Sequence, residues 1–435
     1  MMGHDYLRHN HLKFFLLSVL IILVNCQLKE PLKTHGINFL ENRAEKLTVN
    51  TSNKNAIQQF LAYLSRSWKG PIHLNIGLNE PLYGLAAFKQ FSFDTQPKEV
   101  KPTILPDLSV LSGKKIMVLV GQMEPNHPFE RLLSEFASWS NVVVLVENTS
   151  NLQNELFNHC IDRSLNSIDP NDSAFQPEVL LSFGGAIVSK RIKAYLRQIS
   201  LYIHWRIGFD FPEMNTFGTL SAQLSQDPVE FMRALLQTSL NLQTTNFKGK
   251  WKAIDYIAKD RLSQFSSSAQ HLHDFDVFQA LQATLEGPLN LHLANSSVVR
   301  YAQLFDPIPN LTYFSNRGTS GIDGSVSTAV GAALASPSEQ HLLICGDTSF
   351  IYDSNALWTS PFPKNLKIMI IQNHGGGIFQ IIPGPAQSPL REQYFEATHP
   401  HHPGKIAEGF GFEVHYLSEK SKLENTLAAF LADNN

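Results

Sequence analysis

Short apolar runs alternate with amphipathic segments along most of the chain. The first four runs are KKIMVLVG, NVVVLVEN, EVLLSFGG and LYIHWRIG, which begin at Lys114, Asn141, Glu178 and Leu201. Helical spacing of apolar residues lies between them, at about 128–139 and in VSKRIKAYLRQI. Apolar strands separated by amphipathic helices predict a parallel, doubly wound α/β sheet. This pattern predicts a Rossmann-like middle domain over residues 90–245.

The same alternation starts again further along the chain. FDVFQALQATL and GSVSTAVGAALA have helical spacing, and LNLHLANS, LTYFSNRG, HLLIC and LKIMII have the character of buried strands. These segments predict a second α/β domain over residues 250–435.

The N-terminal part departs from this pattern. Residues 55–85 predict one amphipathic helix and one alternating strand, as at the end of a domain, and residues 1–54 form an atypical segment. The run FFLLSVLIILV, residues 14–24, is too short to span a bilayer. It fits either the apolar region of a signal peptide or a buried strand, and membrane contact is expected only in the first case.

Composition excludes several classes of protein. The 435 residues are 43% hydrophobic and 17% charged, with a net charge of −3, so no basic surface indicates a nucleic acid partner. Three cysteines, Cys26, Cys160 and Cys345, form no CxxC pair, which argues against a disulfide framework and against a structural zinc site. The expected compartment is the reducing cytosol.

Polar residues follow two of the predicted strands at the point where each ends. Gly346-Asp347 follows HLLIC, and Asn373, then Gly375 to Gly377, follows LKIMII. Carboxyl ends of parallel strands gather ligands, Mg²⁺ prefers oxygen donors, and glycine lets the backbone approach a phosphate. The two strand ends together predict a site for a metal diphosphate.

The spacing of these residues resembles the diphosphate motif of thiamine diphosphate enzymes. From about Gly70 onward, GPIHLNIGLNEPLY, FGGAIVSKR, NSSVVR, SNRGTSGIDG, GDTSFIYDSNALW and NHGGGIFQIIPG resemble segments of one family, 2-succinyl-5-enolpyruvyl-6-hydroxy-3-cyclohexene-1-carboxylate synthase of menaquinone biosynthesis. The resemblance implies a thiamine diphosphate-binding fold and a transferase. Such an enzyme decarboxylates 2-oxoglutarate and adds the succinyl-semialdehyde carbanion to isochorismate. It also implies a homodimer or homotetramer in the cytoplasm.

The resemblance further implies roles for individual residues. Asp347, Asn373 and the carbonyl of Gly375 would ligate Mg²⁺ or Mn²⁺, and Ile322 would be the apolar wedge that bends the cofactor. The wider implied cofactor set is Ser320, Gly321, Ile322, Asp347, Thr348, Ser349, Asn373, Gly375, Gly376, Ile378 and Phe379. The implied substrate set is Lys190, Arg191, Ser296, Arg300, Arg317, Phe379 and Ile382, whose cations fit two dicarboxylate substrates.

Two other motifs receive plainer interpretations. The prolines around His399, His401 and His402 predict a solvated loop rather than a metal site. GGAIVSKR lacks the GxGxxG fingerprint and indicates a nucleotide-type fold without its nucleotide.

One expected component has no counterpart before Asn55. The family's catalytic glutamate belongs to a pyrimidine-binding domain, of which residues 55–85 resemble only the last helix and strand, so no catalytic acid is assigned. Two hypotheses stay open: an enzyme of menaquinone synthesis, impaired or completed by another polypeptide, or a non-catalytic remnant that binds Mg-diphosphate or serves as a structural partner.

Overall fold

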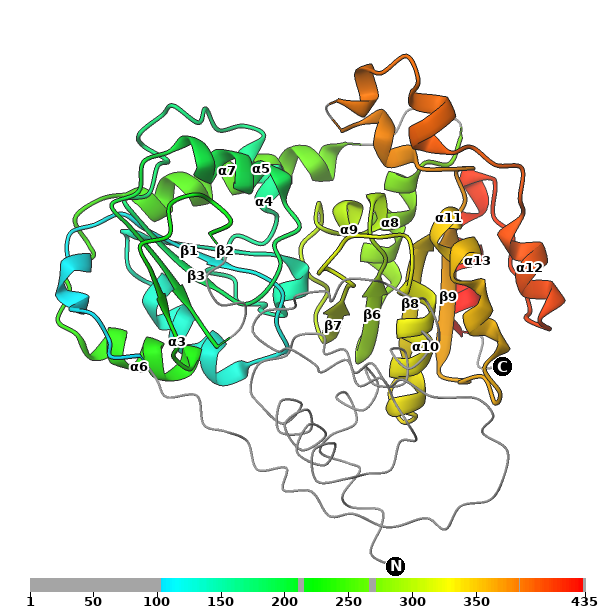
Figure 1. The fold of residues 1–435 in the computed structure, drawn as a ribbon, viewed down its shortest axis with the longest axis horizontal. Helices are drawn as coiled ribbons and strands as arrows, with labels where there is room; N and C mark the ends of the chain where they lie inside the picture. The colour runs from blue at the N-terminus through cyan, green and yellow to red at the C-terminus, as the bar shows by residue number, and fades with distance from the viewer. Residues whose placement is uncertain (1–102, 210–214, 266–270, 383, 433–435) are drawn as a thin grey trace, which may run out of the picture. The chain divides into compact units, whose positions relative to one another are not determined.

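The computed structural model describes residues 103–209, 215–265, 271–382 and 384–432 (Figure 1). Nearly all of these residues belong to one compact unit that contains two parallel sheets. The atypical segment predicted at 1–54 and the helix and strand predicted at 55–85 lie outside the described residues.

The first sheet has five parallel strands in the order β2-β1-β3-β4-β5. The strands are β1 (Ile116–Val120), β2 (Val142–Val146), β3 (Val179–Phe183), β4 (Ile203–Ile207) and β5 (Ala222–Leu224). The helices are α3 (His127–Ala137), α4 (Ile161–Leu165), α5 (Lys190–Gln198), α6 (Pro228–Gln237) and α7 (Phe247–Gln264). The doubly wound α/β class predicted from the apolar runs is confirmed.

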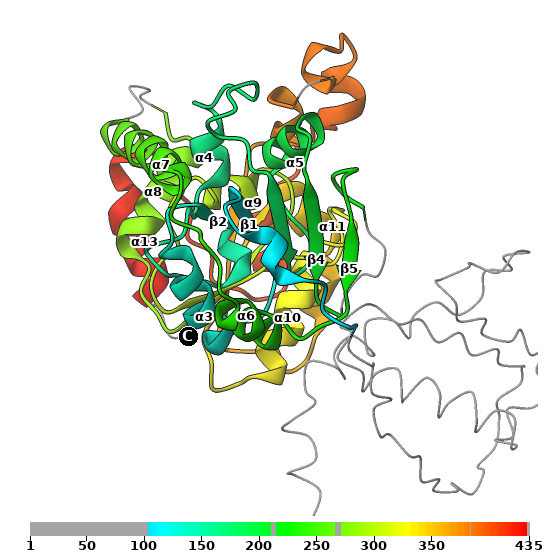
Figure 2. The same ribbon diagram turned by 90° about the vertical axis from the view of Figure 1, so that its left-hand side faces the viewer.

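Successive residues of each strand supply the two faces of this sheet. Ile116, Val118 and Val120 of β1 pack with α3 and α6, while Met117 and Leu119 pack with α4, α5 and α7. Figure 2 shows these two groups of helices on opposite sides of the strands. Burial on both faces explains why β1 and β2 are continuous apolar runs rather than alternating ones.

Helix α7 crosses the domain boundary predicted between residues 245 and 250. Its Trp251 is fully buried against the first sheet, and the indole N–H donates to the carbonyl of Phe175 at 3.2 Å. The rings of Phe175, Tyr195 and Phe247 lie edge-on to it, with centroids 6.0–6.5 Å away. The helix therefore packs with the first sheet, and the boundary itself stays a prediction.

We expect Trp251→Ala to lower the free energy of unfolding by about 3–5 kcal/mol, because it leaves a large cavity in the core. Urea unfolding followed by circular dichroism measures the change. Trp358, which is 75% exposed, is the matched control, and its replacement with alanine should cost less than about 0.5 kcal/mol. Equal losses for the two variants would contradict this account of the core.

The second sheet has four parallel strands in the order β7-β6-β8-β9. The strands are β6 (Leu289–Leu293), β7 (Leu311–Phe314), β8 (His341–Gly346) and β9 (Leu366–Ile371). The helices are α8 (Asp274–Thr284), α9 (Ser297–Ala302), α10 (Ser325–Ala335), α11 (Asp347–Tyr352), α12 (Pro403–Gly409) and α13 (Leu423–Ala432). Helices α8, α9 and α13 cover one face, and α10, α11 and α12 cover the other.

Polar side chains that follow the first sheet's strands join it to the second sheet. Asn151 donates to the carbonyl of Tyr313 at 3.0 Å and accepts from its backbone N–H at 2.7 Å. The amide of Gln122 donates to the carbonyl of Ser315, and that of Asn148 donates to the carbonyl of Ala302. The segments that follow β1 and β2 are thereby held against β7 and against the segments that follow β6 and β7.

No helix within the described ranges combines the length and apolar character needed to cross a bilayer.

Candidate functional site

The ends of β8 and β9 meet at the carboxylate of Asp347. This residue begins α11 directly after β8 and is 1% exposed. One carboxylate oxygen accepts from the backbone N–H groups of Asn373 and His374 at 3.1 and 2.6 Å. The other accepts from the N–H and hydroxyl of Thr348 at 2.6 and 3.2 Å. The structure thus brings together the two polar strand ends that stand out in the sequence.

A glycine turn follows β9 and passes close to other backbone. His374 has a φ of 63°, and Gly375 has a φ of 152°. A Cβ on Gly375 would lie 2.6 Å from the carbonyl oxygen of Glu396, and one on Gly376 would lie 2.8 Å from the ring of Phe379. The N–H of Gly376 donates to the same carbonyl of Glu396 at 2.6 Å. Only glycine fits at position 375, whereas a Cβ at position 376 would have to displace the Phe379 ring, so these residues shape the turn.

The side chain of Asn373 is held by a carboxylate that the sequence analysis missed. Asn373 hydrogen-bonds to Asp274, the first residue of α8. Burial raises the pKa of Asp274, the bond from Asn373 opposes that shift, and nearby Asp347 adds to it. Because a carboxylate attracts the amide's N–H₂ end, this contact favours an Asn373 orientation with the amide oxygen turned away from Asp274.

The donor set at this edge fits a hard divalent cation. A buried carboxylate at Asp347, an amide oxygen at Asn373 and the carbonyl of Gly375 are the oxygen types that Mg²⁺ takes from proteins. A Cβ at position 377 would lie only 3.1 Å from Asn373 Nδ2, so glycine there avoids crowding the amide. The residues present therefore fit the metal that the sequence predicts.

His399 lies beside Asp347, which the sequence analysis did not predict. Its side chain is 11% exposed, and Nε2 is 3.7 Å from a carboxylate oxygen of Asp347. Neither ring nitrogen has a hydrogen-bond partner among the described residues. The solvated-loop interpretation is wrong for His399, because its backbone N–H donates to the carbonyl of His374 and carries the ring inward. His401 and His402 are exposed, as expected.

The remaining residues of the predicted cofactor set lie in segments that follow β7, β8 and β9. Ser320, Gly321 and Ile322 lie between β7 and α10, and Ile322 is 41% exposed despite its apolar side chain. The carbonyl of Gly321 accepts from the amide of Asn295 at 3.0 Å. Thr348 and Ser349 lie in the first turn of α11. Ile378 is buried, whereas Phe379 and Ile382 are partly buried after the glycine turn.

A second group of side chains is cationic and lies where the two sheets meet. Arg317, after β7, is 8% exposed, and its NH1 donates to the side-chain oxygen of Asn295 at 2.7 Å. Its Nε has no hydrogen-bond partner among the described residues. Arg300 of α9 donates to the carbonyl of Ser296 at 2.5 Å. Burial and neighbouring Arg300 lower the pKa of Arg317, whereas Glu147 raises it. A buried guanidinium with a spare N–H favours a ligand carboxylate.

The predicted pair at the start of α5 is not part of this group. Lys190 and Arg191 are exposed. Lys193, one turn further along, is half-buried and interacts electrostatically with Glu147, Arg317 and Arg300. Burial lowers the pKa of Lys193. The sequence signal that could have found Lys193 is its position three residues before buried Leu196 and next to buried Ile192 in α5.

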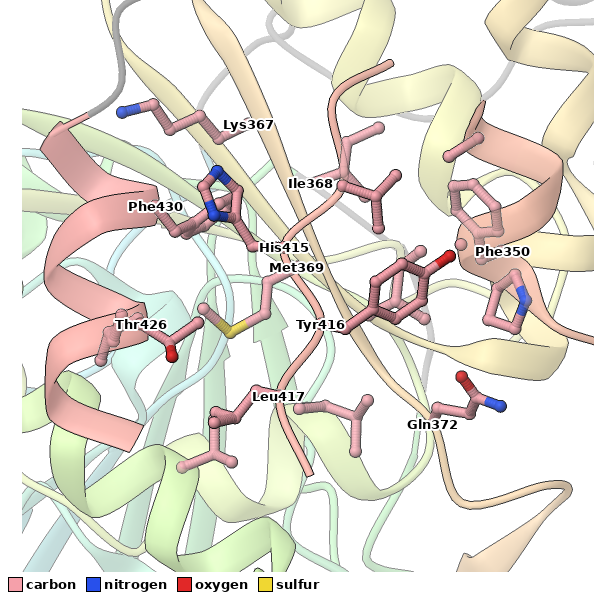
Figure 3. A pocket seen from close by; sticks show the side chains of 18 of the residues that line it. Phe350, Lys367, Ile368, Met369, Gln372, His415, Tyr416, Leu417, Thr426 and Phe430 are labelled. Atoms are coloured by element: carbon pink, nitrogen blue, oxygen red, sulfur yellow. The ribbon is translucent and has the colours of Figure 1, made fainter. Parts of the chain in front are cut away.

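A separate, mostly apolar cavity of about 370 Å³ lies beside β9. Figure 3 shows the segment with His415, Tyr416 and Leu417 running alongside β9, near Phe430 of α13. The lining also includes Asp274, which contacts Asn373, but not Asp347 or the two arginines. Its lining does not match a charged diphosphate or dicarboxylate.

Comparison with known proteins gives consistent results. The family described as thiamine pyrophosphate enzyme, C-terminal TPP binding domain, matches residues 295–435, which include both groups of polar side chains from the second sheet. Several curated proteins named 2-succinyl-5-enolpyruvyl-6-hydroxy-3-cyclohexene-1-carboxylate synthase are similar to this chain.

The protein of that name from Flavobacterium johnsoniae is 39% identical over 344 residues, which cover 76% of this chain and 61% of the relative. The one from Flavobacterium psychrophilum is 36% identical over 405 residues, covering 91% and 70%. The one from Desulfotalea psychrophila is 36% identical over 353 residues, covering 79% and 63%. The chain therefore spans less than two thirds of the length of two of these three relatives.

Proposed function

The chain belongs to the 2-succinyl-5-enolpyruvyl-6-hydroxy-3-cyclohexene-1-carboxylate synthase family, and from this we propose that it acts in the thiamine diphosphate-dependent reaction for which the family is named. The substrates would be 2-oxoglutarate, which is decarboxylated, and isochorismate, which receives the remaining four-carbon unit. The observation that carries the proposal is the contact between Asp347 and the backbone of Asn373, which supports a metal site formed by residues at one sheet edge.

The chain's own residues would hold the cofactor by its diphosphate end. Asp347, Asn373 and the carbonyl of Gly375 would bind Mg²⁺ or Mn²⁺, which in turn would bind the diphosphate. When bound, thiamine diphosphate would supply the electron sink that a 2-oxoacid decarboxylation needs. Exposed Ile322 offers an apolar surface for the middle of the cofactor, with Ser320 and Gly321 beside it.

Arg317 and Arg300 would bind the substrate carboxylates. Arg317 is buried and Arg300 is partly buried, and an ion pair is stronger there than at the surface. Ser296, Phe379 and Ile382 would complete the substrate site around the two arginines. Exposed Lys190 and Arg191 would contact the substrate only if it extended beyond Arg317 and Arg300. A planar guanidinium matches a carboxylate through two parallel N–H bonds, so it would orient the substrate as well as attract it.

The proposal also covers the cellular location and the oligomeric state of the protein. All three small molecules are cytosolic metabolites, so we place the protein in the cytoplasm. We also propose a homodimer or homotetramer.

Purified chain tests the proposal in two steps. Calorimetry with thiamine diphosphate and MgCl₂ or MnCl₂ should show metal-dependent binding. Adding 2-oxoglutarate and isochorismate should then release CO₂ and form the adduct, both detected by mass spectrometry. Binding without turnover would favour the alternative of a non-catalytic Mg-diphosphate protein, and absence of binding with either metal would reject the cofactor assignment.

A further inference from the structure

Glu147 is a buried carboxylate that no part of the proposed reaction uses. It directly follows β2 and is 1% exposed. Its oxygens accept from the backbone N–H of Val188 at 2.7 and 3.0 Å and from that of Ser189 at 2.7 Å. Ser189 is the N-cap of α5, so Glu147 holds the loop that leads into this helix. A carboxylate at a helix N-terminus is stabilised by the free N–H groups there.

Charged groups from four other segments interact with this carboxylate. Arg317 follows β7, Arg300 lies in α9 and Lys193 lies in α5, and all three attract Glu147. Asp162 of α4 repels it, while accepting a hydrogen bond from the Ser189 hydroxyl. Glu147 is therefore a shared counter-ion for the cations to which the proposed function assigns the substrate carboxylates.

A dicarboxylate at Arg317 would compete with Glu147 for the same positive charge. In this cluster Arg317, Arg300 and Lys193 are the three cations, and Glu147 and Asp162 are the two protein carboxylates. A bound dianion would raise the number of negative charges from two to four. Adding a proton to one buried carboxylate is then cheaper than keeping all four ionised. Glu147 is the more enclosed of the two protein carboxylates, since it is almost fully buried.

We propose that Glu147 is a positioning residue that holds the start of α5 and balances Arg317 while the site is empty, and takes up a proton when a dicarboxylate binds. The positioning of α5 stands independently, whereas the identity of the dicarboxylate rests on the proposed function. Glu147 acts through Arg317, Arg300 and Lys193.

Its ionisation supports this role. Burial raises the pKa of Glu147 from 4.5 to about 7; the N–H bonds from Val188 and Ser189 oppose the shift, Asp162 adds to it, and Arg317 opposes it. A raised carboxyl pKa means that the folded protein binds more protons than the unfolded chain between about pH 4.5 and 7. The associated stability is complete below that range and is lost as the pH rises through it.

A first experiment needs no ligand. Melting temperatures of the full chain and of Glu147→Gln are compared from pH 5 to pH 8. We expect wild type to lose several degrees relative to Glu147→Gln over this range, because only wild type must ionise a buried carboxyl. Glu178→Gln is the matched control, since Glu178 interacts with Lys114 on the same sheet, its pKa is lowered, and the variant should follow wild type. Parallel curves for Glu147→Gln and wild type would overturn the proposal.

A second experiment measures the proton directly. Calorimetric titration with 2-oxoglutarate, without thiamine diphosphate, is run at pH 7.5 in phosphate and in Tris, whose ionisation enthalpies differ. Wild type should take up roughly half a proton or more per ligand, and Glu147→Gln none. Equal uptake by both proteins would overturn the proton-uptake claim. If 2-oxoglutarate does not bind wild type at all, the substrate assignment fails, while the pH dependence of melting still decides whether Glu147 titrates as proposed.

Discussion

Replacing Asp347 with alanine is expected to weaken Mg²⁺-dependent binding of thiamine diphosphate by at least about 100-fold. The change removes the only carboxylate among the three proposed metal ligands, and loss even of an outer partner of a metal ligand costs about 10- to 100-fold. It also frees the backbone N–H groups of Asn373 and His374, which Asp347 holds at 3.1 and 2.6 Å, so the glycine turn loses its anchor.

Calorimetry at saturating MgCl₂ measures this loss, with circular dichroism to show that the variant is folded. Asp353→Ala is the matched control. Asp353 is also buried, at the other end of α11, but it accepts from the N–H and hydroxyl of Ser327 at 2.7 and 3.0 Å instead of contacting β9. The Asp353→Ala variant should be less stable than wild type and should keep its affinity for the cofactor. Unchanged cofactor affinity in Asp347→Ala would remove the metal site from the proposal.

Replacing Arg317 with alanine is expected to weaken binding of 2-oxoglutarate by at least about 100-fold and to leave thiamine diphosphate affinity unchanged. Removing one partner of a buried, hydrogen-bonded charge pair costs about 2–5 kcal/mol. In the free protein the guanidinium pairs with Asn295, keeps one N–H without a partner among the described residues, and lies near Arg300. Arg300 repels the guanidinium more than Glu147 attracts it, so its charge is only partly balanced until an anion arrives.

Stability provides the contrast for this variant. Arg163 is equally buried, but it pairs with Asp255 and Asp306 at 3.2 and 3.0 Å. Arg163→Ala should lower the free energy of unfolding by about 3–5 kcal/mol, whereas Arg317→Ala should cost little or raise it, as expected for a residue kept for binding. Arg317→Lys keeps the charge without the planar fork and should recover only part of the affinity. Wild-type affinity for 2-oxoglutarate in Arg317→Ala would refute the assignment.

The local pattern of apolar and polar residues was sufficient to predict most of the strands and one of the two groups of site residues, the one around Asp347. Each apolar run from Ile116 to Ile371 is a parallel strand, whereas the short edge strand β5 was not predicted. Asp347 and Asn373 follow neighbouring strands, and the carboxyl ends of parallel strands share one edge. Their meeting could therefore be predicted without knowing any side-chain position.

The histidine beside Asp347 could not be predicted in the same way. His399 is separated from Asp347 by the glycine turn and several short helical segments, and its approach depends on one backbone bond to His374. Spacing in THPHHP indicated only a turn. Irregular segments that pack over a long range have no hydrophobic periodicity, so the sequence pattern could not predict this contact.

The sequence by itself determined the two parallel α/β sheets, all of their described strands except β5, and the oxygen donors at the ends of β8 and β9, because these follow from apolar period and strand polarity. Only the tertiary structure decided that buried Glu147 and Arg317 interact with partly buried Lys193 and Arg300 in one cluster while Lys190 and Arg191 stay exposed. The cluster exists because two sheets, each complete in its own pattern, pack together, and burial at their junction sets which charges interact and how they ionise.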